Sequence, residues 1–201
     1  MIRATCMSLA VCTGAAAAPL NVSNPSFENP GLGDGGVSGS IGSWIQSGPS
    51  GVFNPVRGVH FSDVTATDGQ QAVFTNGGSI QQILPDVLTA FTDYTLSVDV
   101  GDRLDVAPQP YVVGLYAGGQ LLAEVADGPV PDDGYVTVVV NYTAELGDPL
   151  LGGQLQIVLV NNGGPQVLFD NVRLDATPTP EPAAWVVFGP WLLRRRRRSA
   201  E

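Results

Sequence analysis

The strongest constraint on this chain is a pattern of short alternating runs. Between residues 19 and 176, apolar residues recur at every second position in short stretches, and no stretch shows the period of an amphipathic helix. Gly, Pro, Asn and Asp separate the runs, as at Asn76-Gly77-Gly78. This pattern predicts an all-β fold, an antiparallel β-sandwich jelly roll of about nine strands. The expected strands cover 52–56, 70–75, 79–84, 94–100, 111–117, 120–125, 136–142, 155–159 and 166–174.

Charge and cysteine content narrow the function. Residues 19–180 hold 17 carboxylates against three arginines, a net charge of −14, and the whole chain lacks lysine. A body this acidic repels nucleic acid, so no nucleic-acid partner is expected. Both cysteines, Cys6 and Cys12, lie in the first dozen residues, and His60 is the single histidine. With so few nucleophiles and bases, the sequence predicts a protein that is not an enzyme and has no catalytic residue.

The first 18 residues have the pattern of a secretory signal. One arginine is followed by an apolar stretch and then by Ala15 to Ala18, where signal peptidase is expected to cut. The alternative is a lipoprotein signal, since Leu9 to Cys12 approximates a lipobox. Cleavage at the alanines would remove both cysteines from the mature protein.

The C-terminal end is divided into three short parts. Residues 177–182 form a proline-rich linker that favours polyproline II, residues 183–193 are uncharged and apolar, and residues 194–201 begin with five arginines. The order of Pro180-Glu181-Pro182, an apolar stretch and the run Arg194, Arg195, Arg196, Arg197 and Arg198 resembles the PEP-CTERM sorting signal of Gram-negative bacteria. The resemblance implies a transient stay in the inner membrane, cleavage by an exosortase, and release to the cell surface or extracellular matrix. The apolar stretch is shorter than the ~20 residues that span a bilayer, and Pro190 interrupts it.

The body, residues 19–176, resembles a second family. The opening Asn24-Pro25-Ser26-Phe27-Glu28 and the closing Phe169-Asp170-Asn171-Val172 are similar to motifs of galactose-binding-like jelly rolls, the fold of many carbohydrate-binding modules. The resemblance implies a structural calcium ion held by Glu28 and Asp170, and an extracellular polysaccharide as partner. A sugar ring needs aromatic side chains on which to stack, and Phe53, Tyr111 and Tyr135 are the candidates.

The strand pattern also predicts that the carboxyl of Asp170 is buried. Strict alternation places Leu168, Asp170, Val172 and Leu174 on one face, and because three of them are apolar this is the core face. A buried carboxylate needs a partner, and a cation is one candidate. The alternatives are that Asp170 caps backbone amides or pairs with Arg57 or Arg103.

Together these features predict an exported, non-enzymatic surface or matrix protein. The leading expectation is that its body associates with extracellular polysaccharide. The alternatives are a purely structural matrix component and a glycan-active hydrolase that uses paired carboxylates.

Overall fold

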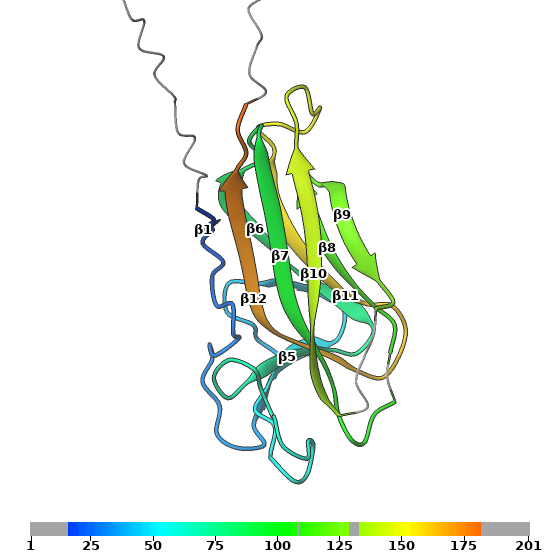
Figure 1. The fold of residues 1–201 in the computed structure, drawn as a ribbon. Helices are drawn as coiled ribbons and strands as arrows, with labels where there is room; N and C mark the ends of the chain where they lie inside the picture. The colour runs from blue at the N-terminus through cyan, green and yellow to red at the C-terminus, as the bar shows by residue number, and fades with distance from the viewer. Residues whose placement is uncertain (1–15, 108, 129–132, 182–201) are drawn as a thin grey trace, which may run out of the picture.

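The computed structural model describes residues 16–107, 109–128 and 133–181, which contain strands and no helix long and apolar enough to cross a membrane. Two antiparallel sheets pack face to face, so the predicted β-sandwich jelly roll is confirmed (Figure 1). The strands are β1 (Ala18–Pro19), β2 (Val37–Ser38), β3 (Ile45–Ser47), β4 (Ser50–Phe53), β5 (Ala72–Thr75), β6 (Gly78–Val87), β7 (Thr92–Asp102), β8 (Tyr111–Ala117), β9 (Gln120–Ala126), β10 (Gly134–Ala144), β11 (Gln154–Asn161) and β12 (Val167–Pro178).

The seven-stranded sheet has the order β10-β7-β12-β5-β4-β2, with β1 paired to the end of β12, and the five-stranded sheet has the order β3-β6-β11-β8-β9. The nine predicted runs all form strands. Only the very short β1, β2 and β3 were not expected. In Figure 1 the long strands β12, β7 and β10 lie side by side, with β1 next to β12 at one end and the segments coloured cyan at the other.

Side chains from alternate positions of both sheets fill the space between them. Leu96, Val98 and Val100 of β7 face Leu155, Ile157 and Leu159 of β11 across the sandwich, and all are essentially unexposed. Burial of such side chains is the main stabilising contribution, about 1.5 to 3 kcal/mol each. The alternation predicted for these strands is therefore confirmed.

Strand β12 departs from strict alternation. Asp170 lies opposite Asp99, but Arg173 lies opposite Ser97, so β12 has one extra residue in this stretch. The left-handed backbone of Asn171, with φ of 51°, forms this β-bulge. Before the bulge Phe169 faces the core, and after it Val172 and Leu174 do.

Because of the bulge, the predicted direction of the Asp170 side chain is wrong. This residue is buried, as predicted, but it points away from the space between the sheets, on the outer face of the seven-stranded sheet. Leu168 likewise belongs to a separate apolar cluster there. A single extra residue shifts the alternation by one position, which periodicity alone does not reveal.

We expect Asn171 to be important for stability. The Asn171→Ala variant places a residue with a Cβ penalty in the left-handed region and leaves Oδ2 of the buried Asp99 without the amide that donates to it at 2.9 Å. The free energy of unfolding should fall by about 2 kcal/mol, measured by denaturant titration. Asn171→Gly should recover the backbone part of this loss. An alanine variant as stable as the wild type would contradict this role of the bulge.

Candidate functional site

A second, smaller apolar cluster lies on the outer face of the seven-stranded sheet. Its buried members are Phe53, Phe61, Ala72 and Leu168, with Phe74 and Tyr135 packed against them. The irregular segment 57–71, which we call the cover segment, connects β4 to β5 and supplies Phe61. The outer face of this sheet is thus partly enclosed by the chain's own loop.

Two aromatic rings stack in this cluster. Phe61 of the cover segment lies on Tyr135 of β10, with ring centroids 5.4 Å apart and an interplanar angle of 16°. Tyr135 lies across Gly101 of β7, where any Cβ would overlap its ring. The hydroxyl of Tyr135 donates to the carbonyl oxygen of Thr65 at 2.9 Å. Gly101 therefore provides the space that positions Tyr135 against the cover segment.

Asp170 lies beneath the cover segment and is fully buried. Its Oδ2 accepts hydrogen bonds from the backbone N–H of Thr67 at 2.7 Å, the hydroxyl of Thr67 at 2.9 Å and the N–H of Asp68 at 3.0 Å. Its Oδ1 accepts from the N–H of Asn171 at 2.7 Å. Burial raises the pKa of Asp170 to about 7, and these hydrogen bonds only partly oppose the rise.

This arrangement shows which protein groups contact Asp170. The carboxyl caps backbone amides, whereas Arg57 pairs with Asp63 and Arg103 pairs with Asp105. A carboxyl with a pKa near 7 is half protonated at neutral pH, so it can both give and take a proton.

A second carboxyl stands next to Asp170. Asp99 lies directly opposite on β7, accepts from the hydroxyl of Thr137 at 2.6 Å and is also almost fully buried. Burial, and then the charges of Asp170 and Asp99, raise the pKa of Tyr135 well above its usual value. The strand pairing therefore places the two carboxyls side by side on the outer face of the sheet.

An open cavity of about 380 Å³ adjoins this cluster. It is lined by Asp63, Val64, Thr67, Asp133, Gly134 and Tyr135. Thr67 lines the cavity and also donates to Asp170, so it links the cavity to the buried carboxyl. A small molecule in the cavity would contact Tyr135 and Thr67.

Glu28 binds the same cover segment from another side. Its Oε1 accepts from the N–H groups of Gln70 and Gln71, each at 2.7 Å. Gly69, with φ of 79°, provides the room for this carboxylate, since a Cβ there would overlap it. Glu28 in the first motif and Asp170 in the last motif therefore both bind the cover segment.

The donor atoms fit a calcium ion at Glu28 better than at Asp170. Calcium takes oxygen ligands, and four hydrogen bonds already occupy the two oxygens of Asp170. The hydrogen bonds of Glu28 involve one of its two oxygens. Within the described parts of the chain, no three acidic, His or Cys side chains come together, so backbone carbonyls and water would have to complete the shell.

The three aromatic residues predicted to bind sugar do not form an exposed surface on which a sugar ring could stack. Phe53 is buried under Arg103, whose guanidinium lies 5.3 Å from the ring centroid, and Tyr111 is fully buried in the main core. Tyr135 is half-buried at the cavity. His60 packs edge-on against Phe53 and accepts from the N–H of Val56.

The sorting motif lies at the edge of the described chain. Pro180 and Glu181 are its last described residues, and Pro182 and Arg194 to Arg198 lie outside the described residues, as does the signal peptide up to residue 15.

Fold and site together define a jelly-roll sandwich with an enclosed acidic group on the outer face of one sheet. The chain belongs to the HpiC1-like family, described as HpiC1 cyclase, which matches residues 18–175. No curated protein matches the sequence significantly.

Solved structures of similar proteins agree with this family. The Stig cyclase Fisc from Fischerella sp. TAU, in complex with (3Z)-3-(1-methyl-2-pyrrolidinylidene)-3H-indole, is 27% identical, with a TM-score of 0.74 over 82% of this chain and 100% of that one. A cyclase from Fischerella sp. TAU with 4-(1H-indol-3-yl)butan-2-one is 25% identical, with a TM-score of 0.72 over 82% of this chain and 100% of that one. The CBM22-1 xylan-binding domain of Paenibacillus barcinonensis Xyn10C, at 16% identity and a TM-score of 0.52 over 85% of this chain and 100% of that one, shares the fold.

These relatives overturn the functional prediction. The sequence predicted a non-enzymatic surface or matrix protein, whereas the family and its similar structures are cyclases, which are enzymes. The prediction rested on the scarcity of His and Cys, and it interpreted the motif around Asp170 as part of a calcium site. The motif does not reveal the hydrogen bonds of Asp170 to Thr67, which lies about a hundred residues away in the sequence.

Proposed function

We propose that this chain is a cyclase that closes a ring in a flat aromatic substrate, with Asp170 as the proton donor. The observation that carries this proposal is a fully buried carboxyl with a pKa of about 7 that accepts hydrogen bonds from Thr67, a residue that lines an open cavity together with Tyr135. The indole compounds in the Fischerella cyclase structures support a planar aromatic substrate. A planar ring of that kind matches the exposed part of Tyr135.

The chemistry requires one proton to be given and one to be returned. Asp170 transfers its proton to an alkene carbon of the substrate, and the resulting cation is attacked by the substrate's own aromatic ring. The new ring forms as that bond closes, and the aromatic carbon then loses a proton to the Asp170 carboxylate. The product is an isomer of the substrate, so no further reactant is needed.

The residues around Asp170 suit both halves of this cycle. Phe61 and Tyr135 stack on each other and exclude water from this side of the sheet, and Tyr135 alone of the two borders the cavity. The hydroxyl of Thr67 can rotate, so it donates to the ionised carboxylate and accepts from the protonated acid. Asp170 therefore keeps a partner in either protonation state.

Substrate reaches Asp170 only when the cover segment moves. The contacts that close it are the hydrogen bonds of Thr67 and Asp68 to Asp170, and that of Tyr135 to the carbonyl of Thr65. Gly58 and Gly69 lie near its two ends, with φ of 74° and 79°. Backbone rotation at these two glycines can provide the hinges for this movement. We infer that the segment opens to admit substrate and closes to exclude water.

The test is turnover of indoles that carry an alkenyl side chain, followed by chromatography and mass spectrometry for products of unchanged mass. Asp170→Asn should lower the rate by about 10² to 10⁴, because the amide cannot donate this proton. The rate of the wild type should be constant below the pKa of about 7 and fall as pH rises through it, because only the protonated acid is active.

The matched control is Asp175→Asn, which removes a carboxylate from the same strand away from the cavity. It should keep full activity. A cyclising Asp170→Asn variant, or a rate that rises with pH through 7, would refute the role of Asp170.

We also propose that a calcium ion stabilises the domain, with Glu28 as its carboxylate ligand. Support comes from the chemistry of the donor set and from the resemblance of the Asn24–Glu28 motif to jelly-roll modules. When bound, the ion would reinforce the tie between the first strand region and the cover segment. It takes no part in proton transfer.

Chelation with EDTA should lower the melting temperature of the wild type by roughly 5 to 10 °C, from the linkage of a metal bound only by the folded state. Glu28→Gln should remove this response, and Asp170→Asn should retain it. If the response survives in Glu28→Gln and disappears in Asp170→Asn, the ligand is Asp170 instead.

We further propose that the protein is exported by residues 1–18 and processed by an exosortase near Pro180-Glu181-Pro182. The support is the sequence of the two ends alone. Intact mass of the protein from its native host should show neither Cys6 nor Arg194. A native form that retains the arginine run would contradict this processing.

A further inference from the structure

We infer that the cavity beside Tyr135 selects substrates that carry a positive charge, and that Asp133 is the residue that recognises it. The inference rests on the proposed function and specifies its substrate class. Asp133 and Asp63 contribute the two carboxylates that line the cavity.

The two carboxylates differ in what neutralises them. Asp63 pairs with Arg57, so its charge is compensated within the cover segment. The described residues form two ion pairs, Arg57 with Asp63 and Arg103 with Asp105, and Asp133 is in neither. Its oxygens accept one N–H, that of Ser62, at 3.2 and 3.3 Å. Asp133 therefore brings an uncompensated negative charge to the cavity.

The position of Asp133 next to Tyr135 also favours binding of an aromatic cation. Asp133 is two residues before Tyr135 on the same chain and lines the same cavity, so a carboxylate and an aromatic ring border one space. A flat aromatic amine satisfies both, because its ammonium group is attracted by the carboxylate and its ring contacts the tyrosine. The strongly acidic body adds a general field that favours cations and repels anions.

A fixed positive charge on the substrate is compatible with proton donation. Proton transfer from Asp170 leaves a carboxylate behind, so the net charge of the site does not change. The charged group of the substrate would stay at Asp133 in the cavity, with Thr67 between it and the buried carboxyl. Asp133 is thus a residue for binding and specificity.

The experiment is calorimetric titration of the full-length protein with three indoles of nearly equal size. Tryptamine is cationic, 3-propylindole is neutral and indole-3-propionate is anionic at neutral pH. We expect tryptamine to bind the wild type about five- to tenfold more tightly than 3-propylindole, and the anion to bind most weakly. Added salt should reduce the difference between the cation and the neutral compound.

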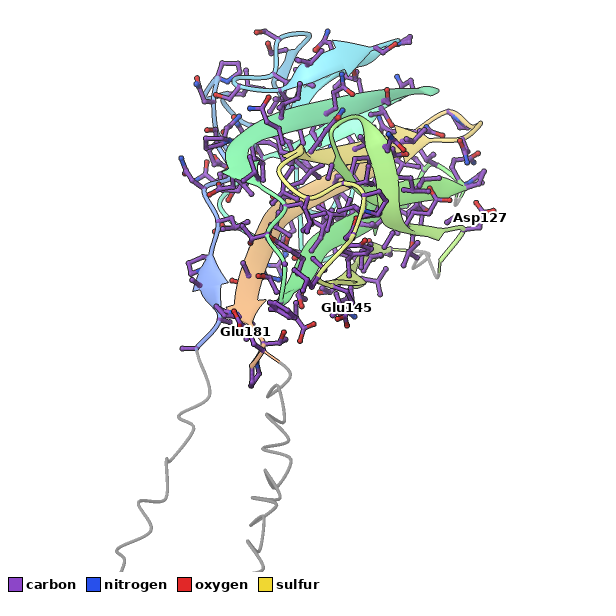
Figure 2. All side chains as sticks on the ribbon, turned by 90° about the horizontal axis from the view of Figure 1, so that it is seen from above. Asp127, Glu145 and Glu181 are labelled. Atoms are coloured by element: carbon purple, nitrogen blue, oxygen red, sulfur yellow. The ribbon has the colours of Figure 1, made fainter. Side chains whose placement is uncertain are left out.

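Asp133→Asn should abolish the preference for tryptamine while the affinity for 3-propylindole stays the same. Asp133→Glu keeps the charge and should keep the preference, which separates charge from a disturbed contact with Ser62. The matched control is Glu145→Gln, which removes one charge beyond the other end of β10, roughly 35 Å away at the rise of a β-strand. Figure 2 labels Glu145 and Glu181, both on the side of the molecule where the described chain begins and ends.

Equal affinities for tryptamine and 3-propylindole in the wild type would overturn the inference, as would an equal effect of Glu145→Gln and Asp133→Asn. Either result leaves Asp170 and ring closure untouched. If none of the three indoles binds, the aromatic cavity itself is wrong as a substrate site, and the proposed function fails with it.

Discussion

The β-bulge at Asn171 determines where the chemistry of this molecule lies. Without the extra residue, strict alternation with Val172 and Leu174 would point Asp170 between the two sheets, into the main core that contains Leu96 and Val98. With it, the carboxyl faces a separate cluster that the cover segment closes. The main core supplies stability and the outer cluster supplies a site, and one backbone irregularity keeps them apart.

The pKa of Asp170 expresses a competition between burial and hydrogen bonding. Four donors converge on the carboxylate and favour ionisation, yet removal from water prevails and raises the pKa from 3.8 to about 7. Because the folded-state pKa lies above the unfolded value, the ionised form destabilises the fold, by about 4 kcal/mol at pH above 7. This contribution is absent below pH 3.8 and grows as pH rises towards 7.

Much of the fold was predictable and little of the site was. Alternation located nine strands, and the motifs around Glu28 and Asp170 indicated that the two ends of the domain meet. Alternation could not reveal the bulge, and no local pattern connects Asp170 to Thr67 or Tyr135, which approach it only in three dimensions. The fold was also a poor guide to activity, since a xylan-binding domain and cyclases share it.

In this chain the cover segment encloses one end of the outer face of the seven-stranded sheet. An exposed face with aromatic side chains can bind a sugar, but it keeps any carboxyl in water and near its ordinary pKa. Here Phe61 and the backbone of Thr67 exclude water from Asp170, and Gly101 lets Tyr135 close the remaining side. Burial by the cover segment thereby raises the pKa of Asp170, and the ionised carboxylate lowers the stability of the fold at neutral pH.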